Sequence, residues 1–388
     1  DSLVWALEGG ASPRLYNRTG GAWTLQRSTA GSDLTAANNG GLADFAGSLW
    51  IAQESRVSRW TGAVYTQSFG ALTDTGSNSR PMKVIAGNLY IGDGRYIAKI
   101  DSTPTFTATA LTLPANTIIR SMEIYGDRLY ISADNGSIAK IYIWDGISTT
   151  YQSDIELTSE TTGLFLKYSE GILWGVAPKG QIGTPIYVLS GSTFQKIMLI
   201  PANVSATNPF GITNYKGGLL IASDNTGATG LYEDGVAGVW MINRFDSNHP
   251  YSAIIAFNVG NGVTQNQIGA IYASGNTIYI ASRNVSSSAF QVFESDNTNM
   301  NTAGYWISLP IDAGDASTKK IWHAIQIDAE TITSAASLYV SYRTDYGTTF
   351  TDAKQFTSGG NTIIPIGRTG KVIEIKIQIN AAGGTLST

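Results

Sequence analysis

Short apolar strands separated by glycine turns recur along the first three quarters of the chain. Each copy has a glycine turn and then an apolar run with an aromatic residue near its start. The copies read Gly47-Ser48-Leu49-Trp50-Ile51-Ala52, Gly87-Asn88-Leu89-Tyr90-Ile91-Gly92, Gly126-Asp127-Arg128-Leu129-Tyr130-Ile131-Ser132, Gly171-Ile172-Leu173-Trp174-Gly175-Val176, Gly218-Leu219-Leu220-Ile221-Ala222 and Gly275-Asn276-Thr277-Ile278-Tyr279-Ile280-Ala281. Glycine turns between short apolar runs predict antiparallel β-hairpins, so the chain is expected to be all-β.

The spacing of the copies indicates which all-β fold they form. The aromatic residue, or the leucine that replaces it, falls at Trp5, Trp50, Tyr90, Tyr130, Trp174, Leu220 and Tyr279. Most steps match the ~40–50 residues of a four-stranded propeller blade. A β-sandwich does not repeat one hairpin at even spacing, whereas each propeller blade packs on two equivalent neighbours. We therefore predict a β-propeller of about seven blades, with these aromatic residues packed between blades rather than forming a row of sugar-binding sites.

The first blade is predicted to be incomplete. Leu3-Val4-Trp5-Ala6-Leu7 matches the repeat but has no upstream strand. Either residues upstream of Asp1 supply that strand, or Tyr305-Trp306-Ile307-Ser308-Leu309 does. The chain begins with Asp1 rather than Met, so it is expected to be processed or a fragment. On this interpretation the propeller spans residues 1–312.

The pattern changes after Pro310, where residues 311–318 are interpreted as a linker. In the last strand Ile373, Ile375, Ile377 and Ile379 alternate with polar residues, which is typical of a half-buried strand. Four more strands are expected at residues 319–328, 337–342, 348–356 and 362–366. Five strands in about seventy residues predict a small β-sandwich or jelly-roll at 319–388.

Two resemblances concern this C-terminal module. The segment Arg343-Thr344-Asp345-Tyr346-Gly347-Thr348-Thr349-Phe350 is similar to the Asp-box hairpin of sialidases, with Arg343 in place of Ser and Phe350 in place of Trp. That resemblance implies a structural turn in which Asp345 caps backbone N–H groups. Residues 319–380 also resemble modules of bacteriophage virion proteins, through Lys320-Ile321-Trp322-His323-Ala324-Ile325 and Val340-Ser341-Tyr342-Arg343-Thr344-Asp345-Tyr346-Gly347. This second resemblance implies a tail or capsid-surface protein.

Composition excludes several classes of function. The net charge of −4 disfavours binding to nucleic acid, and the absence of cysteine excludes disulfides and thiolate sites. No run of 18 apolar residues is present, so no membrane span is expected. The two histidines, His249 and His323, are too few for a three-histidine zinc site, and no nucleophile elbow or phosphate-binding loop accompanies them.

Other candidate sites receive a structural interpretation. A glycosidase needs two facing carboxylates, and a sialidase also needs three converging arginines. The arginines do not recur in a way that marks such a site; those considered are Arg14, Arg18, Arg27, Arg56, Arg59, Arg80, Arg95, Arg120 and Arg128. Asp134-Asn135-Gly136 and Asp224-Asn225 could ligate calcium, but Asp and Asn are also common in tight turns. We assign no catalytic, cofactor-binding or metal-binding residue.

These observations predict a non-enzymatic structural or adhesion component of a phage-like particle, on the virion surface or extracellular. Its expected partners are other virion proteins, further copies in a symmetric homo-oligomer, and a cell-surface glycan. An alternative is a secreted propeller that binds or cleaves carbohydrate, as sialidases do. An intracellular scaffold is a third interpretation, disfavoured because the Gly-His and Trp-Asp signature of WD40 repeats is missing, although Trp144-Asp145 occurs once.

Overall fold

The computed structural model shows an almost purely β-stranded protein. The residues that it describes are 4–8, 12–19, 21–28, 34, 40–74, 76, 78–178, 184–200, 203–204, 209–224, 238–243, 252–258, 266–284, 290–295, 303–308, 310–315, 317–329 and 336–381. Among them the only helical element is the single 3₁₀ turn η1 (Pro209–Gly211). The chain forms two compact units, residues 1–295 and 296–388, which are described separately.

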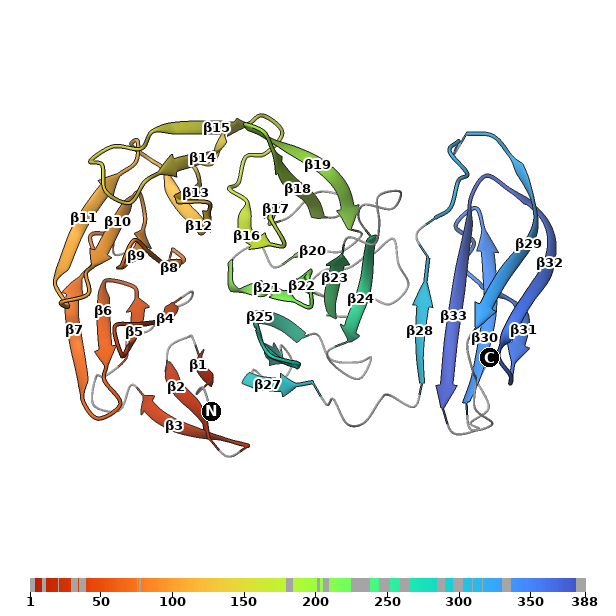
Figure 1. Ribbon diagram of the computed structural model, residues 1–388, viewed down its shortest axis with the longest axis horizontal. Coiled ribbons are helices and arrows are strands. Elements are labelled where there is room, and N and C mark those ends of the chain that lie inside the picture. Colours follow the sequence, from red (N-terminus) through yellow and green to blue (C-terminus); the bar gives the residue numbers. More distant parts are fainter. Residues whose placement is uncertain are drawn as a thin grey trace. The chain divides into compact units, whose positions relative to one another are not determined.

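Unit 1 contains seven antiparallel sheets among its described residues, in chain order (Figure 1). The first four are β1 (Val4–Glu8), β2 (Arg14–Thr19) and β3 (Ala22–Ser28); β4 (Gly41–Phe45), β5 (Ser48–Gln53), β6 (Arg56–Trp60) and β7 (Tyr65–Ala71); β8 (Met82–Ile85), β9 (Asn88–Asp93), β10 (Tyr96–Ile100) and β11 (Phe106–Thr112); and β12 (Ile118–Tyr125), β13 (Arg128–Asp134), β14 (Ala139–Trp144) and β15 (Ser153–Leu157). The other three are β16 (Phe165–Ser169), β17 (Ile172–Val176), β18 (Thr184–Ser190) and β19 (Thr193–Ile200); β20 (Asn203–Val204), β21 (Ile212–Tyr215), β22 (Gly218–Asp224), β23 (Gly238–Asn243) and β24 (Ser252–Asn258); and β25 (Asn266–Ser274), β26 (Thr277–Asn284) and β27 (Phe290–Glu294).

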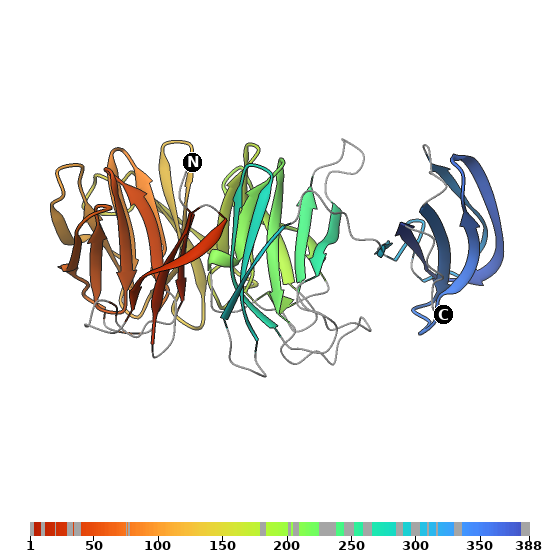
Figure 2. The same cartoon turned by 90° about the horizontal axis from the view of Figure 1, so that it is seen from below.

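The sheets are arranged around a common centre, with β4, β8, β12, β16, β21 and β25 nearest to it (Figure 1). In the view of Figure 2 their strands run roughly along the vertical, so the hairpin turns gather on two opposite faces. This is a propeller-like fold, as the repeat predicted. It follows from the sequence because each repeat forms one meander that can bury its faces only against its neighbours.

The repeated aromatic residues pack between sheets, as predicted. Trp50 is fully buried among Leu89 and Ile91 of the next sheet, and Tyr90 packs in turn with Trp144. Trp174 lies in a cluster with Leu219 and other residues of the following sheet. Apolar clusters therefore link each sheet to the next one along the chain.

The first sheet also contacts the seventh. Trp23 meets Tyr279 edge-on, with ring centroids 6.2 Å apart, and the Arg18 guanidinium lies 2.5 Å from a Glu294 carboxylate oxygen. The first sheet has three strands among the described residues, and β1 aligns with the second strand of the other repeats. Side-chain contacts, rather than a shared strand, join the two ends of unit 1 in the part of the chain that the structure describes.

Unit 2 consists of two antiparallel sheets in its described residues (Figure 1). One has the order β28–β33–β30–β31, and the other pairs β29 with β32. Their bounds are β28 (Ala303–Ile307), β29 (Lys320–Ala329), β30 (Ala336–Thr344), β31 (Thr351–Phe356), β32 (Gly360–Gly370) and β33 (Ile373–Ala381). The two sheets share one apolar cluster, which includes Ile325, Val340 and Ile364. All five strands predicted for residues 319–388 are present, and β28, whose residues were considered for the first blade of the propeller, is a sixth.

The boundary between the units differs from the predicted 1–312 and 319–388. Strand β28 pairs with β33, with Trp306 opposite Ile377, so it belongs to unit 2 and does not complete the first sheet. The predicted linker at 311–318 is also wrong at its start, because Ile311 and Ile373 exchange two backbone hydrogen bonds of 2.8 and 3.0 Å. The apolar pattern of β28 is too short to indicate which sheet it joins.

The Asp-box-like hairpin connects β30 to β31 and is hydrogen-bonded to the residues before β33. Asp345 accepts backbone hydrogen bonds from Lys371 and Val372, so it caps N–H groups as the resemblance implied. Arg343, which replaces the usual Ser, forms a two-bond pair with Glu374 and donates to the Gly347 carbonyl. Glu374 is only 1% exposed, although the alternation of β33 placed it on the polar face.

Candidate functional site at the inner hairpin turns

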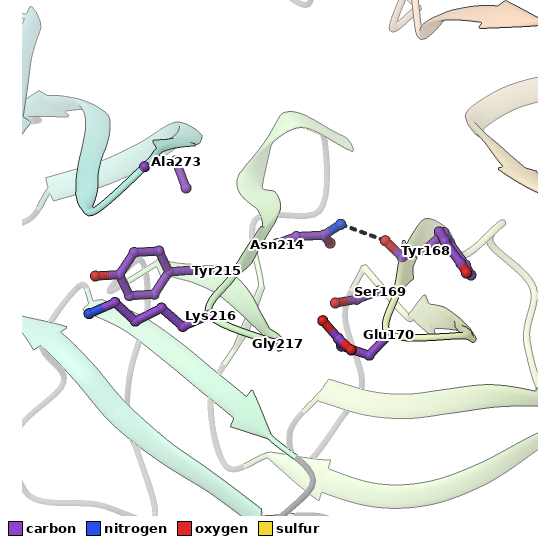
Figure 3. Close-up of a pocket in the computed structure, with 9 residues that line it drawn as sticks. Tyr168, Ser169, Glu170, Asn214, Tyr215, Lys216, Gly217 and Ala273 are labelled. Atoms are coloured by element: carbon purple, nitrogen blue, oxygen red, sulfur yellow. Dashed lines mark hydrogen bonds between the residues drawn. The ribbon is translucent and has the colours of Figure 1, made fainter.

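A depression of about 270 Å³ lies where the first hairpin turns of three successive sheets meet. These are the turns between β16 and β17, β21 and β22, and β25 and β26. Its lining residues are Tyr168, Ser169, Glu170, Asn214, Tyr215, Lys216, Gly217, Ala273 and Gly275 (Figure 3). Its volume is slightly below the range of about 300–1,000 Å³ for small-molecule pockets, so it suits one small group such as a single sugar ring.

Hydrogen bonds fix the polar wall of this depression. The Asn214 side-chain amide donates to the Tyr168 carbonyl at 2.6 Å, which links β21 to β16 (Figure 3). The buried Ser169 hydroxyl donates to the Gly218 carbonyl at 3.4 Å. Glu170 is exposed, and its side chain points toward Gly217. The amide and the carboxylate are groups that commonly bind hydroxyl-bearing ligands.

Tyrosines accompany these polar groups in four consecutive sheets. Tyr125 and Tyr168 have ring centroids 5.8 Å apart and so bridge the fourth and fifth sheets. Tyr215 donates its hydroxyl to the Asn276 carbonyl at 3.3 Å, and the Lys216 ammonium lies 5.1 Å from its ring centroid. Tyr168 and Tyr272 are 41% and 52% exposed. The repeat aromatics are used in packing, whereas these tyrosines, which precede the turns, leave ring surface available to a ligand.

The positive-φ residues in these turns are not all glycine. Glu170 and Lys216 have φ values of 49° and 47°, and each is followed by a positive-φ glycine, Gly171 or Gly217. Two successive left-handed residues make the tight two-residue turn that suits the strand twist. The strained first position therefore carries a charged side chain at the depression, where asparagine or glycine is the usual choice.

Arginine–aspartate pairs with buried carboxylates form a feature that was not predicted from the sequence. Arg80 and Arg120 each stand two residues before a methionine of an inner strand, and each pairs with the aspartate that ends the next strand. Arg80 is fully buried and lies 3.5 Å from Asp93, while Arg120 lies 2.6 Å from Asp134. The repeated Arg-x-Met signal in the sequence could have revealed them. The arginines do recur, but as structural ties rather than as a substrate site.

The turns considered as possible calcium sites can be followed only in part, at Asp134 and its neighbours. Both carboxylate oxygens of Asp134 accept hydrogen bonds, from Arg120, Gly136 and Gly163, so they serve the local fold. In the described part of the chain no group of three or more His, Asp or Glu side chains could hold a metal ion. Asn225 and His249 lie outside the described residues, and His323 is exposed on β29. No described helix is long and apolar enough to cross a membrane.

Comparison with known proteins adds no assignment. No protein-family model matches the sequence, and no curated protein is detectably similar to it. Solved structures with some likeness include the computationally designed Ika8 protein, at 12% identity and a TM-score of 0.45 over 93% of both chains. A second is the Neurospora crassa Pan2 WD40 domain, at 9% identity and a TM-score of 0.47 over 76% of this chain and 86% of that one. A third is virginiamycin B lyase from Staphylococcus aureus, at 10% identity and a TM-score of 0.45 over 71% of this chain and 89% of that one. At these values the likeness carries no weight for ligand or activity.

Proposed function

We propose that this protein is a non-enzymatic adhesion component of a phage-like particle. In this proposal unit 1 is a seven-bladed propeller that serves as a rigid scaffold for binding, and unit 2 is a β-sandwich that docks it to other virion proteins. Several symmetric copies would stand on the virion surface, where one weak site per copy gives strong attachment through multivalency.

The observation that carries the binding role is the composition of the depression at the inner turns. It combines the half-buried Tyr215 with an amide, a lysine and a single carboxylate, held by backbone of three different sheets (Figure 3). Such a set suits a ligand with an apolar ring face and a rim of hydroxyl groups, as in a cell-surface glycan. Multiple sheets make the site rigid, which reduces the entropy lost on binding.

The same depression disfavours cleavage of glycosides. Hydrolysis by the usual routes needs two carboxyl groups across the scissile bond, about 5 Å or 6.5–9.5 Å apart. Glu170 is the one carboxylate among the lining residues of this depression. A secreted carbohydrate-binding propeller is the second candidate, favoured by the same tyrosines, and it differs from the first only in having no particle.

Two measurements separate these candidates. Mass spectrometry of purified particles from the source organism should find the chain at a fixed ratio to other virion proteins. A glycan array with the purified chain, followed by a hydrolysis assay on any glycan bound, should give binding without turnover. Absence from particles together with glycan binding would favour the secreted protein, and turnover would overturn the non-enzymatic assignment.

A further inference from the structure

The inner strands of six sheets carry one row of equivalent side chains. In each of them the hairpin turn to the second strand has two central residues, beginning at Ala46, Ala86, Gly126, Glu170, Lys216 and Gly275. The third residue before each turn defines the row, which we call the inner row: Ala43, Lys83, Glu123, Lys167, Thr213 and Tyr272. Because these residues share one register position, they stand at one level near the centre of unit 1.

Two neighbouring members of the inner row, Lys83 and Glu123, form an ion pair. The Lys83 ammonium lies 2.9 and 2.8 Å from the two carboxylate oxygens of Glu123. Glu123 is 7% exposed, and one of its oxygens also accepts the backbone N–H of Ile124 at 3.1 Å. The hydrogen-bonding capacity of this carboxylate is therefore largely used by Lys83 and its own backbone.

Lys167 follows Glu123 in the inner row, and its positive charge is left without a comparable partner. Among the described residues no carboxylate oxygen lies within 4.0 Å of its ammonium group, and Glu123 and Lys83 are the charged groups that influence it. Burial lowers the pKa of Lys167, the positive charge of Lys83 lowers it further, and only Glu123 acts in the opposite direction. A partly buried cation without a close counter-ion is costly, and an incoming anion would remove that cost.

The rest of the inner row supplies surfaces that suit a sugar. Thr213 and Tyr272 are the next members after Lys167, and Tyr272 is 52% exposed and stacked on Tyr279. Lys167 itself directly precedes Tyr168, Ser169 and Glu170, which line the depression at the turns. The inner row thus carries two ammonium groups and one carboxylate at the same register position as a hydroxyl group and an aromatic ring, with Lys83 still 24% exposed.

We infer that the inner row binds the negatively charged group of an acidic saccharide, with Lys167 as the principal cation and Lys83 as the second. This inference rests on the proposed glycan-binding function and names its ligand class. The anionic group is a carboxylate, as in a uronic acid, or a phosphate, as in a glycosyl phosphate. The pyranose face packs on a tyrosine ring. The negative charges of the ligand and of Glu123 together balance the positive charges of the two lysines.

The test is isothermal titration calorimetry on the full chain with four hexose probes. Glucuronic acid and glucose 1-phosphate carry the two anionic groups, whereas glucuronamide and glucose are matched neutral probes. We expect one or both anionic probes to bind at least tenfold more tightly than their neutral counterparts, with affinity falling as NaCl is raised. The anionic probe that binds more tightly shows whether the site prefers a carboxylate or a phosphate.

Variants assign the effect to the inner row. Lys167→Met keeps the aliphatic bulk and should weaken binding of the anionic probes at least tenfold without changing binding of the neutral ones. Lys196→Met, on an exposed face of β19, is the matched control and should bind like the unmodified chain. Circular dichroism and the unfolding midpoint of each variant establish that it is folded.

Three outcomes would overturn the inference: equal binding of charged and neutral probes, no binding of any probe, or full retention of affinity in the folded Lys167→Met variant. Equal binding would leave the glycan-binding function standing and refute only the acidic ligand. Failure of the protein to appear in particles would refute the proposed particle role and leave this result untouched.

Discussion

The two units bury a carboxylate with a cation in contrasting ways. In unit 2, Glu374 receives two bonds of 2.8 and 3.1 Å from Arg343, which also donates to Gly347 and lies over the Phe350 ring at 4.6 Å. The carboxylate and the guanidinium are directly paired there. In unit 1, Glu123 is paired by Lys83 while Lys167 stands beside them, so one positive charge remains. A balanced pair serves the fold, whereas an unbalanced group is available for a ligand.

The largest expected effect comes from breaking a buried network that serves the fold. Arg80 is fully buried, pairs with Asp93 and Asp74, and donates to the carbonyls of Glu54 and Gly76. Arg80→Met should lower the free energy of unfolding by about 3–5 kcal/mol, because Asp93 is left buried without its cation. Urea unfolding measures this loss. Arg128→Met, at an exposed pair with Asp127, should change it by less than about 0.5 kcal/mol.

The second largest effect is expected from removing the negative charge of the inner row. Glu123→Gln leaves Lys83 and Lys167 with no carboxylate, so the free energy of unfolding should fall by about 2 kcal/mol, since Lys83 is partly exposed. The same variant should bind the preferred anionic probe more tightly than the unmodified chain. An unchanged or lower affinity in the folded variant would contradict the charge argument.

Removing the surplus charge should have a smaller effect of the opposite sign. Lys167→Met should raise the free energy of unfolding by about 1 kcal/mol at neutral pH, because a partly buried cation is replaced by an apolar group of similar size. Since the pKa of Lys167 is lowered in the folded protein, the unfolded chain binds that proton more tightly, and the penalty fades as pH rises toward the ordinary lysine value. Urea midpoints from pH 7 to 10.5 should therefore converge. A destabilised variant would show that Lys167 is structural.

The smallest expected effect lies at an exposed turn. Hydrogen bonds from the Ser148 hydroxyl and from the backbone of Ser148 and Ile147 lower the pKa of Asp145 to about 2. A lowered carboxyl pKa gives stability that is present above the ordinary Asp value and is lost as pH falls through about 2. Asp145→Asn should thus lower the urea midpoint slightly at pH 5, with the difference shrinking by pH 2. A difference in urea midpoint that does not change with pH would show that the lowered pKa of Asp145 is not its cause.

The sequence predicted the repeat well because its signal is local. Glycine turns, period-two apolar runs and the seven aromatic positions depend on neighbours in the chain, and Trp50 and Tyr90 pack between sheets as expected. Strand β28 was misassigned because pairing with β33 is a long-range choice that a short apolar run does not encode.

The candidate site was harder to predict than the fold. The inner row is formed by residues about 40 to 60 positions apart, and its charges become informative only when the register of six hairpins is known. Lys83, Glu123 and Lys167 look like ordinary polar positions of half-exposed strands when each is considered alone. Each of them lies seven residues before the aromatic position of its repeat, so extending the alignment of the aromatic residues upstream would have shown them at one position.

The most direct test of the unbalanced inner row is the titration of Lys167 itself. Lysines dimethylated with ¹³C-formaldehyde can be followed by NMR between pH 6 and 11, and the signal missing from Lys167→Met identifies this residue. We predict that the pKa of Lys167 lies below the ordinary lysine value in the free protein and rises when the preferred anionic probe is added. A Lys167 pKa at the ordinary lysine value and unmoved by the probe would contradict the account.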